Sequence, residues 1–228
     1  MAIVMAHGVV SSAFAAENAA VSSATTAEQA GLVDVSTLIP DITLDMRYAG
    51  EQNFLGVKVD GYNAARCLLL EPAARALAQV EAELRTQNHR LRIYDCYRPA
   101  RAVTHFVRWV QDPNDQRTKP AHYPNLDKSA LLGEYIAPVS GHSRGATIDL
   151  TLMDCHSGSC MPLDMGTGFD FFDPRANTDA PDISPAQRAN RQQLLAAMQR
   201  HGFSNYPMEW WHYTLPVDSK TLFDVPID

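Results

Sequence analysis

Two short segments, far apart in a chain of 228 residues, place metal-ligating residue types at close spacing. The first runs from Ser140 to Asp149 and contains His142 between two glycines. The second is Glu209-Trp210-Trp211-His212. Two imidazoles and one carboxylate commonly hold a catalytic zinc ion with its fourth position open, so the fold must bring the segments together. We predict one Zn²⁺ per chain, held by His142, Asp149 and His212.

The first segment continues into residues that alternate as in a half-buried strand. Apolar residues stand at Ala146, Ile148, Leu150 and Leu152, and polar ones at Thr147, Asp149 and Thr151. This alternation directs Asp149 away from the apolar face. The glycines around His142 favour a tight turn, which would place this histidine at the entrance of the strand.

Glu209 is a spare carboxylate three residues from the last histidine. A carboxylate beside a zinc site can take a proton from the attacking water and pass it to a leaving group. The aromatic stretch from Met208 to Leu215 is predicted to be a strand, but a regular strand would direct Glu209 and His212 to opposite sides. A shared site therefore requires Glu209 to lie at a bend or bulge.

Each ligand taken alone has a simpler interpretation. A buried histidine is more often satisfied by hydrogen bonds than by metal, and an aspartate within a strand often pairs with an arginine. The joint pattern is far more demanding, because it combines His-x6-Asp in a turn and strand with Glu-x2-His in an aromatic strand. It favours the metal site.

Further motifs extend this pattern along the chain. They are Met46-Arg47-Tyr48-Ala49, Asn53-Phe54-Leu55-Gly56, Gly61-Tyr62-Asn63, Ile93-Tyr94-Asp95-Cys96-Tyr97-Arg98-Pro99 and Met165-Gly166-Thr167-Gly168-Phe169-Asp170-Phe171. Together with the two ligand segments, they resemble the D-alanyl-D-alanine dipeptidases of the vancomycin-resistance type. These zinc enzymes are related to bacterial D,D-carboxypeptidases and share a zinc-site architecture with hedgehog signalling domains. The likeness covers most of the chain from about Asp34 onward.

The resemblance implies the same three zinc ligands and assigns roles to further residues. It implies that Glu209 is the catalytic base that then becomes the acid, and that Arg98 stabilises the oxyanion. An ordinary salt bridge, for instance to Asp95, is the alternative for Arg98. The catalytic role is favoured because Arg98 lies where a predicted strand gives way to a helix that begins at Pro99, and strand ends often carry site residues.

The resemblance also implies a substrate pocket. Asp170 and Ser140 match positions that hold the free ammonium of the dipeptide, and Tyr48 matches a residue that lines the pocket. Asp170 could instead pair locally, and Ser140 could simply cap a turn. Charge favours Asp170 as the anchor, because a zwitterionic dipeptide needs an anion for its amino end.

The implied function is zinc-dependent hydrolysis of D-alanyl-D-alanine to two D-alanines, with this small dipeptide as the partner. One alternative is a peptidoglycan D,D-carboxypeptidase or endopeptidase on the same scaffold. Another, of a different class, is a non-catalytic zinc-bearing binding module. The presence of both Glu209 and Arg98 argues against the module, since a purely structural zinc needs neither an acid-base group nor an oxyanion donor.

Composition and pattern predict one α+β catalytic domain over residues 31–228, with a small antiparallel sheet that carries the zinc site and helices packed behind it. Helices are expected at Glu71–Arg85, at Pro99–Val110 and after Ser184, and strands near Leu44 and Leu68 and at Leu91–Cys96, Ala146–Met153 and Met208–Leu215. The net charge of -7 argues against a nucleic-acid partner. No apolar run is long enough to span a membrane.

Loops carry two further expectations. The segment Gln111–Lys128 is rich in Pro, Asn and Asp and could rim the site. His89, His122 and His156 fall in predicted loops with no partner at ligand spacing.

Residues 1–30 differ from the rest, since they begin with a small apolar run and continue rich in Ala, Ser and Thr. We predict a secretory signal peptide or a disordered tail here. Four cysteines allow a Cys155–Cys160 disulfide that leaves Cys67 and Cys96 as a second pair, although other pairings and free thiols remain open. A metal at Cys155, His156 and Cys160 is a remote third interpretation. These features favour the periplasm, with the cytoplasm as the alternative.

Overall fold

A mixed β-sheet organises the fold, which a computed structural model describes for residues 20–228. The strands are β1 (Leu32–Asp34), β2 (Thr43–Leu44), β3 (Leu68–Leu70), β4 (His89–Asp95), β5 (Thr147–Asp154), β6 (Met161–Pro162), β7 (Ser204–Asn205) and β8 (His212–Thr214). The α-helices are α1 (Glu71–Arg85), α2 (Ala100–Gln111), α3 (Lys119–His122) and α4 (Pro185–Arg200). Short 3-10 helices are η1 (Val35–Thr37), η2 (Arg47–Ala49), η3 (Lys128–Leu131), η4 (Gly141–Arg144) and η5 (Pro174–Ala176).

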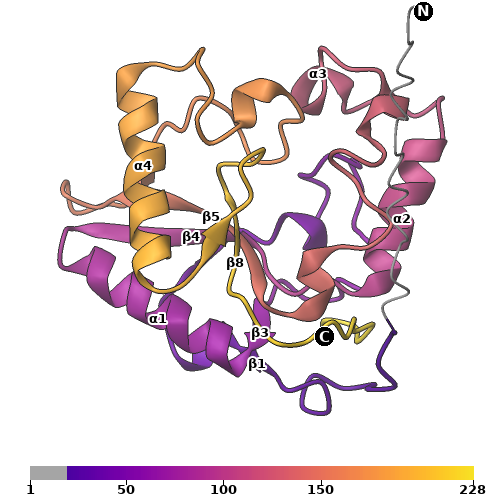
Figure 1. Cartoon of the computed structure of the whole chain (residues 1–228), viewed down its shortest axis with the longest axis horizontal. Helices are drawn as coiled ribbons and strands as arrows, with labels where there is room; N and C mark the ends of the chain where they lie inside the picture. Colours follow the sequence, from indigo (N-terminus) through magenta and orange to yellow (C-terminus); the bar gives the residue numbers. More distant parts are fainter. Residues whose placement is uncertain (1–19) are drawn as a thin grey trace, which may run out of the picture.

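The main sheet has the strand order β2-β4-β5-β8-β7, and β6 pairs with the end of β5. All of its pairings are antiparallel except β2 with β4, which is parallel. Among the described residues, β1 and β3 form a separate antiparallel pair. Strands and helices alternate along the chain around this sheet (Figure 1). The α+β class and the small, mainly antiparallel sheet are as predicted.

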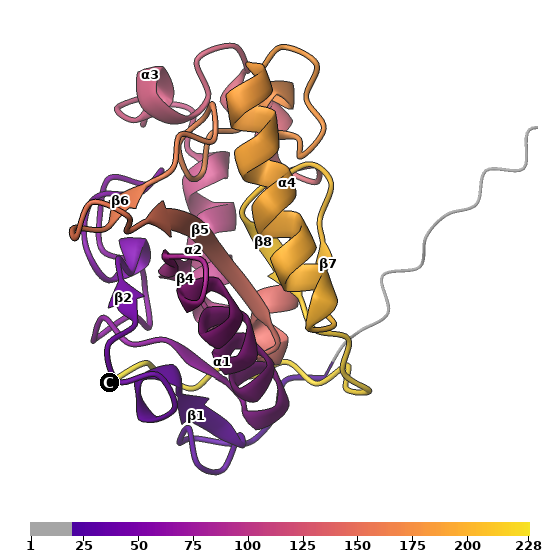
Figure 2. The ribbon, with the colours of Figure 1, turned by 90° about the vertical axis from the view of Figure 1, so that its left-hand side faces the viewer.

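Helices α1 and α4 form where the sequence periodicity predicts helices. In α1, Pro72 lies in the first turn and the buried face includes Leu77, Val80 and Leu84. At the start of α4, Ser184 and Gln187 form a capping box in which each side chain bonds the backbone of the other. The two helices pack against each other on one side of the sheet (Figure 2).

Strand β5 departs from the expected half-buried pattern, because every residue from Thr147 to Met153 is buried. Ile148, Leu150 and Leu152 belong to the core that includes the apolar faces of α1 and α4. Thr147, Asp149 and Thr151, on the opposite face, are buried as well. Asp149 therefore points away from the apolar core, as predicted, but into a buried site rather than into solvent.

A β-bulge in β4 aligns polar residues across the sheet. The pairing of β4 with β5 shifts by one residue between Ile93 and Asp95, so that Asp95 lies opposite Asp149. On the other side of β5, His212 of β8 lies opposite the same Asp149. Three ionisable residues thus form one row across adjacent strands.

Two disulfides join the pairs Cys67–Cys96 and Cys155–Cys160, and this leaves no free cysteine in the chain. The first is buried and links the start of β3 to the end of β4. The second closes the turn between β5 and β6. A metal site that uses Cys155 and Cys160 is thereby excluded.

The chain is already packed before residue 31. Val21 pairs with Leu222 in an isolated bridge, and Ala30 is buried. The signal or tail was predicted over residues 1–30, and its first 19 residues lie outside the described part of the chain. Within residues 20–228, no helix has the length and apolar character needed to cross a membrane.

Gly145 ends η4 with a φ of 77°, a left-handed conformation that glycine adopts most easily. A Cβ atom at this position would lie 2.7 Å from Leu32 Cδ2. The turn between His142 and β5 therefore depends on this residue.

We expect Gly145→Ala to lower the free energy of unfolding by about 1–3 kcal/mol, because the new methyl group adds both backbone strain and a clash. Urea denaturation measures this loss. The matched control is Gly50→Ala, since Gly50 has a φ of -135° and a methyl group added there would meet no atom within 4 Å; its effect should stay within about 0.5 kcal/mol. Equal stability of the two variants would contradict the assignment.

Candidate active site

The two segments that the sequence singled out meet at one end of β5. Here His142 Nε2 lies 3.2 Å from Asp149 Oδ2, and His212 Nδ1 lies 3.1 Å from Asp149 Oδ1. The two imidazole nitrogens are 3.3 Å apart. Their rings are nearly perpendicular, at 80°. Two imidazole nitrogens and the Asp149 carboxylate thus surround a single point.

These separations fit a tetrahedral metal ion. Zinc bonds of roughly 2.0–2.1 Å at tetrahedral angles place neighbouring ligand atoms about 3.3 Å apart. Asp149 Oδ1 is buried and accepts no hydrogen bond of good geometry within residues 20–228, although His212 Nδ1 is close. The two atoms are therefore directed at a shared point rather than at each other. The residues fit a zinc ion or a similar divalent cation.

A hydrogen bond to the backbone fixes the orientation of the His142 ring. Its Nδ1 lies 2.7 Å from the main-chain oxygen of Cys96, which can only accept a hydrogen bond. Nδ1 therefore carries the proton, and Nε2 presents its lone pair to the site. η4 holds this ring in place, because Ser140 Oγ accepts a hydrogen bond from the His142 amide and caps the turn.

Asp149 stays ionised although it is buried. Burial alone raises the pKa of a carboxyl, but the neighbouring His142 and His212 outweigh this effect and hold the pKa of Asp149 below its usual value. For Asp95, which lies beside Asp149 in the row across the sheet, burial dominates and raises the pKa. The histidines thus compensate the charge of one carboxylate, and the other needs a different partner.

Arg98 supplies that partner. Its Nη2 lies 2.9 Å from Asp95 Oδ2 and 3.6 Å from Asp149 Oδ2. The guanidinium also lies over the rings of Tyr48 and Phe106, at 5.1 and 4.9 Å from their centroids. The salt bridge to Asp95, considered as the alternative to a catalytic role, is present. It does not remove Arg98 from the site, because the side chain still lines the cavity.

Glu209 lies in a turn before β8, which meets the requirement that it leave the regular strand. The His212 amide donates to the Glu209 oxygen, and the Glu209 amide donates to the Tyr206 oxygen. This turn places Glu209 Oε2 3.4 Å from His212 Nδ1. Of the strand predicted over Met208–Leu215, only His212–Thr214 is regular.

Burial raises the pKa of Glu209 to about 7, and the negative charge of Asp149 adds to the rise while His212 opposes it. A carboxyl with a pKa near neutrality can both accept and donate a proton at neutral pH. This is the property that a general base which later acts as an acid requires.

Asp170 is a buried carboxylate on the far side of the site. It accepts hydrogen bonds from Tyr48 Oη at 3.0 and 3.2 Å, and forms no ion pair with a basic side chain in the described part of the chain. Burial and the charge of Asp149 raise the pKa of Asp170 well above its usual value. Its φ of 55° is uncommon for a residue other than glycine, and such strain often marks functional positions.

All eight residues predicted for the site line a single cavity of about 290 Å³. They are Tyr48, Arg98, Ser140, His142, Asp149, Asp170, Glu209 and His212. This volume is at the lower end of the range for small-molecule sites. Residues 133–137 and Val139 form part of the wall. The expectation that Gln111–Lys128 rims the site is wrong, since no residue of that segment lines the cavity and part of it forms α3.

Three supporting residues were not assigned to the site from sequence. Tyr62 Oη donates to Asp95 at 2.6 Å, and Asp95 in turn holds Arg98. His122 Nδ1 lies 2.9 Å from the main-chain oxygen of Asp170 and ties down that loop. Asp95 and Tyr62 belong to the family-like motifs Ile93–Pro99 and Gly61–Asn63, and this membership is the only sequence signal that could have identified them. His122 has none.

Two imidazoles and a carboxylate around one point, with a second carboxylate beside them and an arginine facing the same cavity, define a metal-dependent hydrolase. Comparison with known families agrees. Residues 28–226 match the peptidase M15 family, described as D-ala-D-ala dipeptidase.

Several curated relatives are similar over most of their length. A D-alanyl-D-alanine dipeptidase of Streptomyces coelicolor is 42% identical over 85% of this chain and 96% of its own. The enzyme of the same name from Enterococcus faecium is 36% identical over 86% of this chain and 98% of its own. The D-alanyl-D-alanine dipeptidase of Escherichia coli is 36% identical over 81% of this chain and 84% of its own. The chain therefore belongs to the D-Ala-D-Ala dipeptidase family of metallopeptidases.

We expect His142→Ala to abolish tight metal binding, because it removes one of three ligands. After exhaustive dialysis, elemental analysis should find one tightly held zinc ion per wild-type chain and less than about a tenth of that in the variant. The matched control is Glu209→Gln, which alters the same cavity without removing a ligand. A His142→Ala protein that keeps its metal would rule out the proposed triad.

Proposed function

We propose that the protein hydrolyses D-alanyl-D-alanine to two D-alanines with one zinc ion at His142, Asp149 and His212. The observation that carries this proposal is Asp170, a buried carboxyl that faces the small cavity and forms no ion pair with a basic side chain among the described residues. Burial raises its pKa because an ionised carboxylate without an ion-pair partner is costly there, and a ligand that brings a positive charge would stabilise the ionised form. The free ammonium of a dipeptide is such a group, and the names of the curated relatives support the same substrate.

The ammonium and the scissile carbonyl of the substrate then each have a partner. Asp170, held by Tyr48 Oη, binds the ammonium, and Ser140 lies beside Arg98 at 3.5 Å on the cavity wall. The scissile carbonyl oxygen faces the Arg98 guanidinium, which stabilises the negative charge that develops there during attack. Asp95 and the ring of Tyr48 hold this guanidinium in position, so little reorganisation is needed during reaction.

A zinc ion, when bound, polarises the carbonyl and lowers the pKa of water. Glu209 accepts a proton from the water that attacks the carbonyl carbon. The same carboxyl then donates this proton to the amide nitrogen as the peptide bond breaks. Bond cleavage leaves one D-alanine with a new carboxyl group and one with a new amine, and Glu209 is again ionised. The carboxyl proton then passes to the amine, which gives the carboxylate and the ammonium of the two products.

We further propose that the enzyme works in an oxidising compartment such as the periplasm. Both disulfides support this proposal, because such bonds persist where thiols are not kept reduced. There the activity would recycle or remove cell-wall dipeptide.

We expect Glu209→Gln to lower kcat by a factor of about 10²–10⁴ with little change in KM, because the amide cannot move the proton. Release of D-alanine under saturating dipeptide measures the effect. Glu134→Gln is the matched control, since Glu134 is an exposed carboxylate at the wall of the same cavity. A Glu209→Gln enzyme with a kcat close to that of the wild type would refute the role.

A substrate panel tests the proposed specificity. D-Ala-D-Ala should be cleaved in preference to L-Ala-L-Ala and to N-acetyl-D-Ala-D-Ala, because the acetyl group removes the ammonium that Asp170 binds. Asp170→Asn should raise KM for D-Ala-D-Ala at least about tenfold and narrow its advantage over the acetylated peptide. The control is Asp164→Asn, an exposed position in the same loop.

Two outcomes of the panel would favour the alternatives. Preference for the acetylated peptide would indicate a D,D-carboxypeptidase. No turnover of any peptide by the zinc-loaded protein would indicate a non-catalytic binding module.

A further inference from the structure

A second group of metal-ligating side chains lies at the other end of the strands that carry the active site. His89 begins β4, and its cross-strand neighbour in β5 is Asp154. His156 follows two residues later, in the turn that the Cys155–Cys160 disulfide closes. Ligand atoms from these three residues lie within 4.8 Å of one another. The expectation that His89 and His156 lack partners is therefore wrong.

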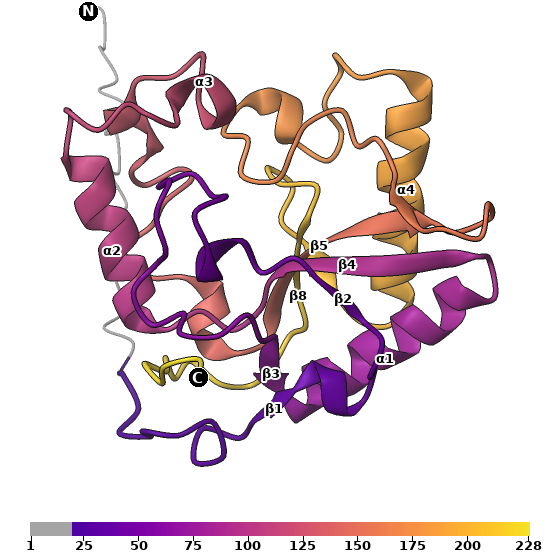
Figure 3. The ribbon, with the colours of Figure 1, turned by 180° about the vertical axis from the view of Figure 1, so that it is seen from behind.

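This group is separate from the active site. Asp154 stands five residues beyond Asp149 in the same strand, which corresponds to about 17 Å. Alternation along β5 also places the two aspartates on opposite faces of the sheet. The start of β4 and the end of β5 lie together at one edge of the molecule, away from β8 (Figure 3).

The hydrogen bonds of the group resemble those of the active-site triad. His89 Nδ1 lies 2.7 Å from the main-chain oxygen of Gln87, so it carries the proton and leaves a lone pair on Nε2. His142 is held in the same way by the oxygen of Cys96. The second histidine differs, because His156 Nδ1 is hydrogen-bonded to Asp154 Oδ1 at 2.6 Å, whereas His212 Nδ1 lies 3.1 Å from Asp149 Oδ1, and an ion must replace the shared proton.

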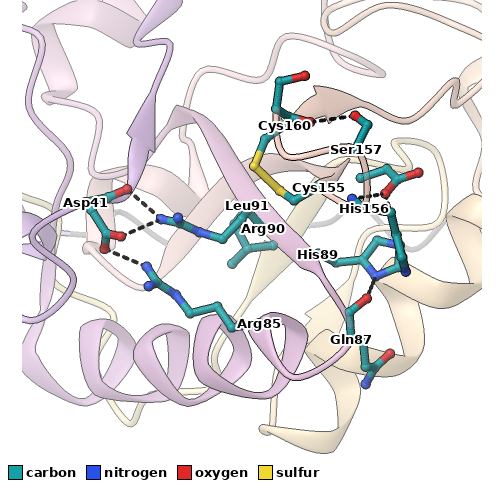
Figure 4. Close-up of a disulfide and its surroundings, with 12 residues drawn as sticks. Asp41, Arg85, Gln87, His89, Arg90, Leu91, Cys155, His156, Ser157 and Cys160 are labelled. Atoms are coloured by element: carbon teal, nitrogen blue, oxygen red, sulfur yellow. Dashed lines mark hydrogen bonds and ion pairs between the residues drawn. A yellow bond between two sulfur atoms is a disulfide. The ribbon is translucent and has the colours of Figure 1, made fainter.

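The surroundings also favour a bound cation. The His89 and His156 rings are nearly perpendicular, with centroids 5.4 Å apart beside the disulfide (Figure 4). The His156 amide donates to Asp154 Oδ1 at 2.9 Å, which fixes the carboxylate against the turn. The side chains of His156 and Asp154 are 57% and 47% exposed, so an ion can enter and keep water ligands.

We propose that His89 Nε2, Asp154 Oδ1 and His156 Nδ1 form a second binding site for a divalent transition-metal ion such as Zn²⁺. Imidazole suits zinc, nickel and copper as a ligand, and among these divalent ions copper generally binds such sites most tightly. Binding of the ion displaces the proton shared between His156 and Asp154. It also displaces the side-chain amide of Gln193, whose Nε2 lies 3.4 Å from His89 Nε2. The ion would join the start of β4 to the disulfide-closed turn. Because the second site is open to solvent, exhaustive dialysis removes its ion, whereas the ion held by the buried His142, Asp149 and His212 is retained.

Titration of the metal-free protein, without a polyhistidine tag, with Zn²⁺ alone tests the proposal. Calorimetry, and metal analysis at equilibrium dialysis against buffer that contains free Zn²⁺, should find two ions per wild-type chain and one in the His89→Gln/His156→Gln variant. His142→Ala should lose the tight ion and keep the weaker one. The matched control is His201→Gln, since His201 pairs with Glu83 but belongs to no such group within residues 20–228.

A gentler variant guards against misfolding. Asp154→Asn keeps an acceptor for the His156 amide but removes the charge, and should weaken the second ion at least about tenfold. Its melting temperature without metal should match that of the wild type. A single ion in the wild-type protein, or two ions of unchanged affinity in the double variant or in Asp154→Asn, would overturn the proposal.

Discussion

Two carboxylates buried side by side set the conditions that the rest of the site must satisfy. The bulge in β4 brings Asp95 opposite Asp149, and neither side chain reaches bulk water. Such a pair is stable only where positive charge is close. Arg98 contacts both carboxylates, and His142 and His212 lie beside Asp149. The row across the sheet is therefore an electrostatic unit, in which the proposed metal ligands, the arginine and Asp95 depend on one another.

Asp170 lies outside this balance, and in the proposed function it provides the selectivity of the cavity. Its burial is not offset by a basic side chain among the described residues, whereas Asp95 has Arg98. The protein thus keeps a buried carboxyl without a basic ion-pair partner at a fixed position, where Tyr48 and His122 hold the loop. In the proposed function, a ligand with a free ammonium stabilises the ionised form of this carboxyl, whereas a blocked amino end does not.

Local sequence signals predicted the parts of the fold that depend on local interactions. The periodicity of α1, the capping box of α4 and the requirement that Glu209 leave the strand all follow from neighbouring residues. The zinc-ligand pattern and the family motifs located every residue of the proposed site in one cavity.

Features that depend on the pairing of distant segments were not predictable in this way. Alternation in β5 indicated one exposed face, but both faces are buried from Thr147 to Met153. Residues 133–137 and Val139 form part of the cavity wall, whereas the more polar segment before them contributes no lining residue. His89 and Asp154 are far apart in sequence and become neighbours only through strand register, so their spacing along the chain carried no signal.

The hydrogen bond from His142 Nδ1 to the main-chain oxygen of Cys96 makes the tautomer of His142 independent of which side chain stands at position 96. Where a carboxylate orients a ligating histidine, a single substitution can remove the acceptor. Here the acceptor belongs to the peptide backbone, which every amino acid supplies. Position 96 is thus free to vary during evolution as far as metal ligation is concerned, and replacing its cysteine would sacrifice a cross-link while the ring of His142 keeps the same tautomer.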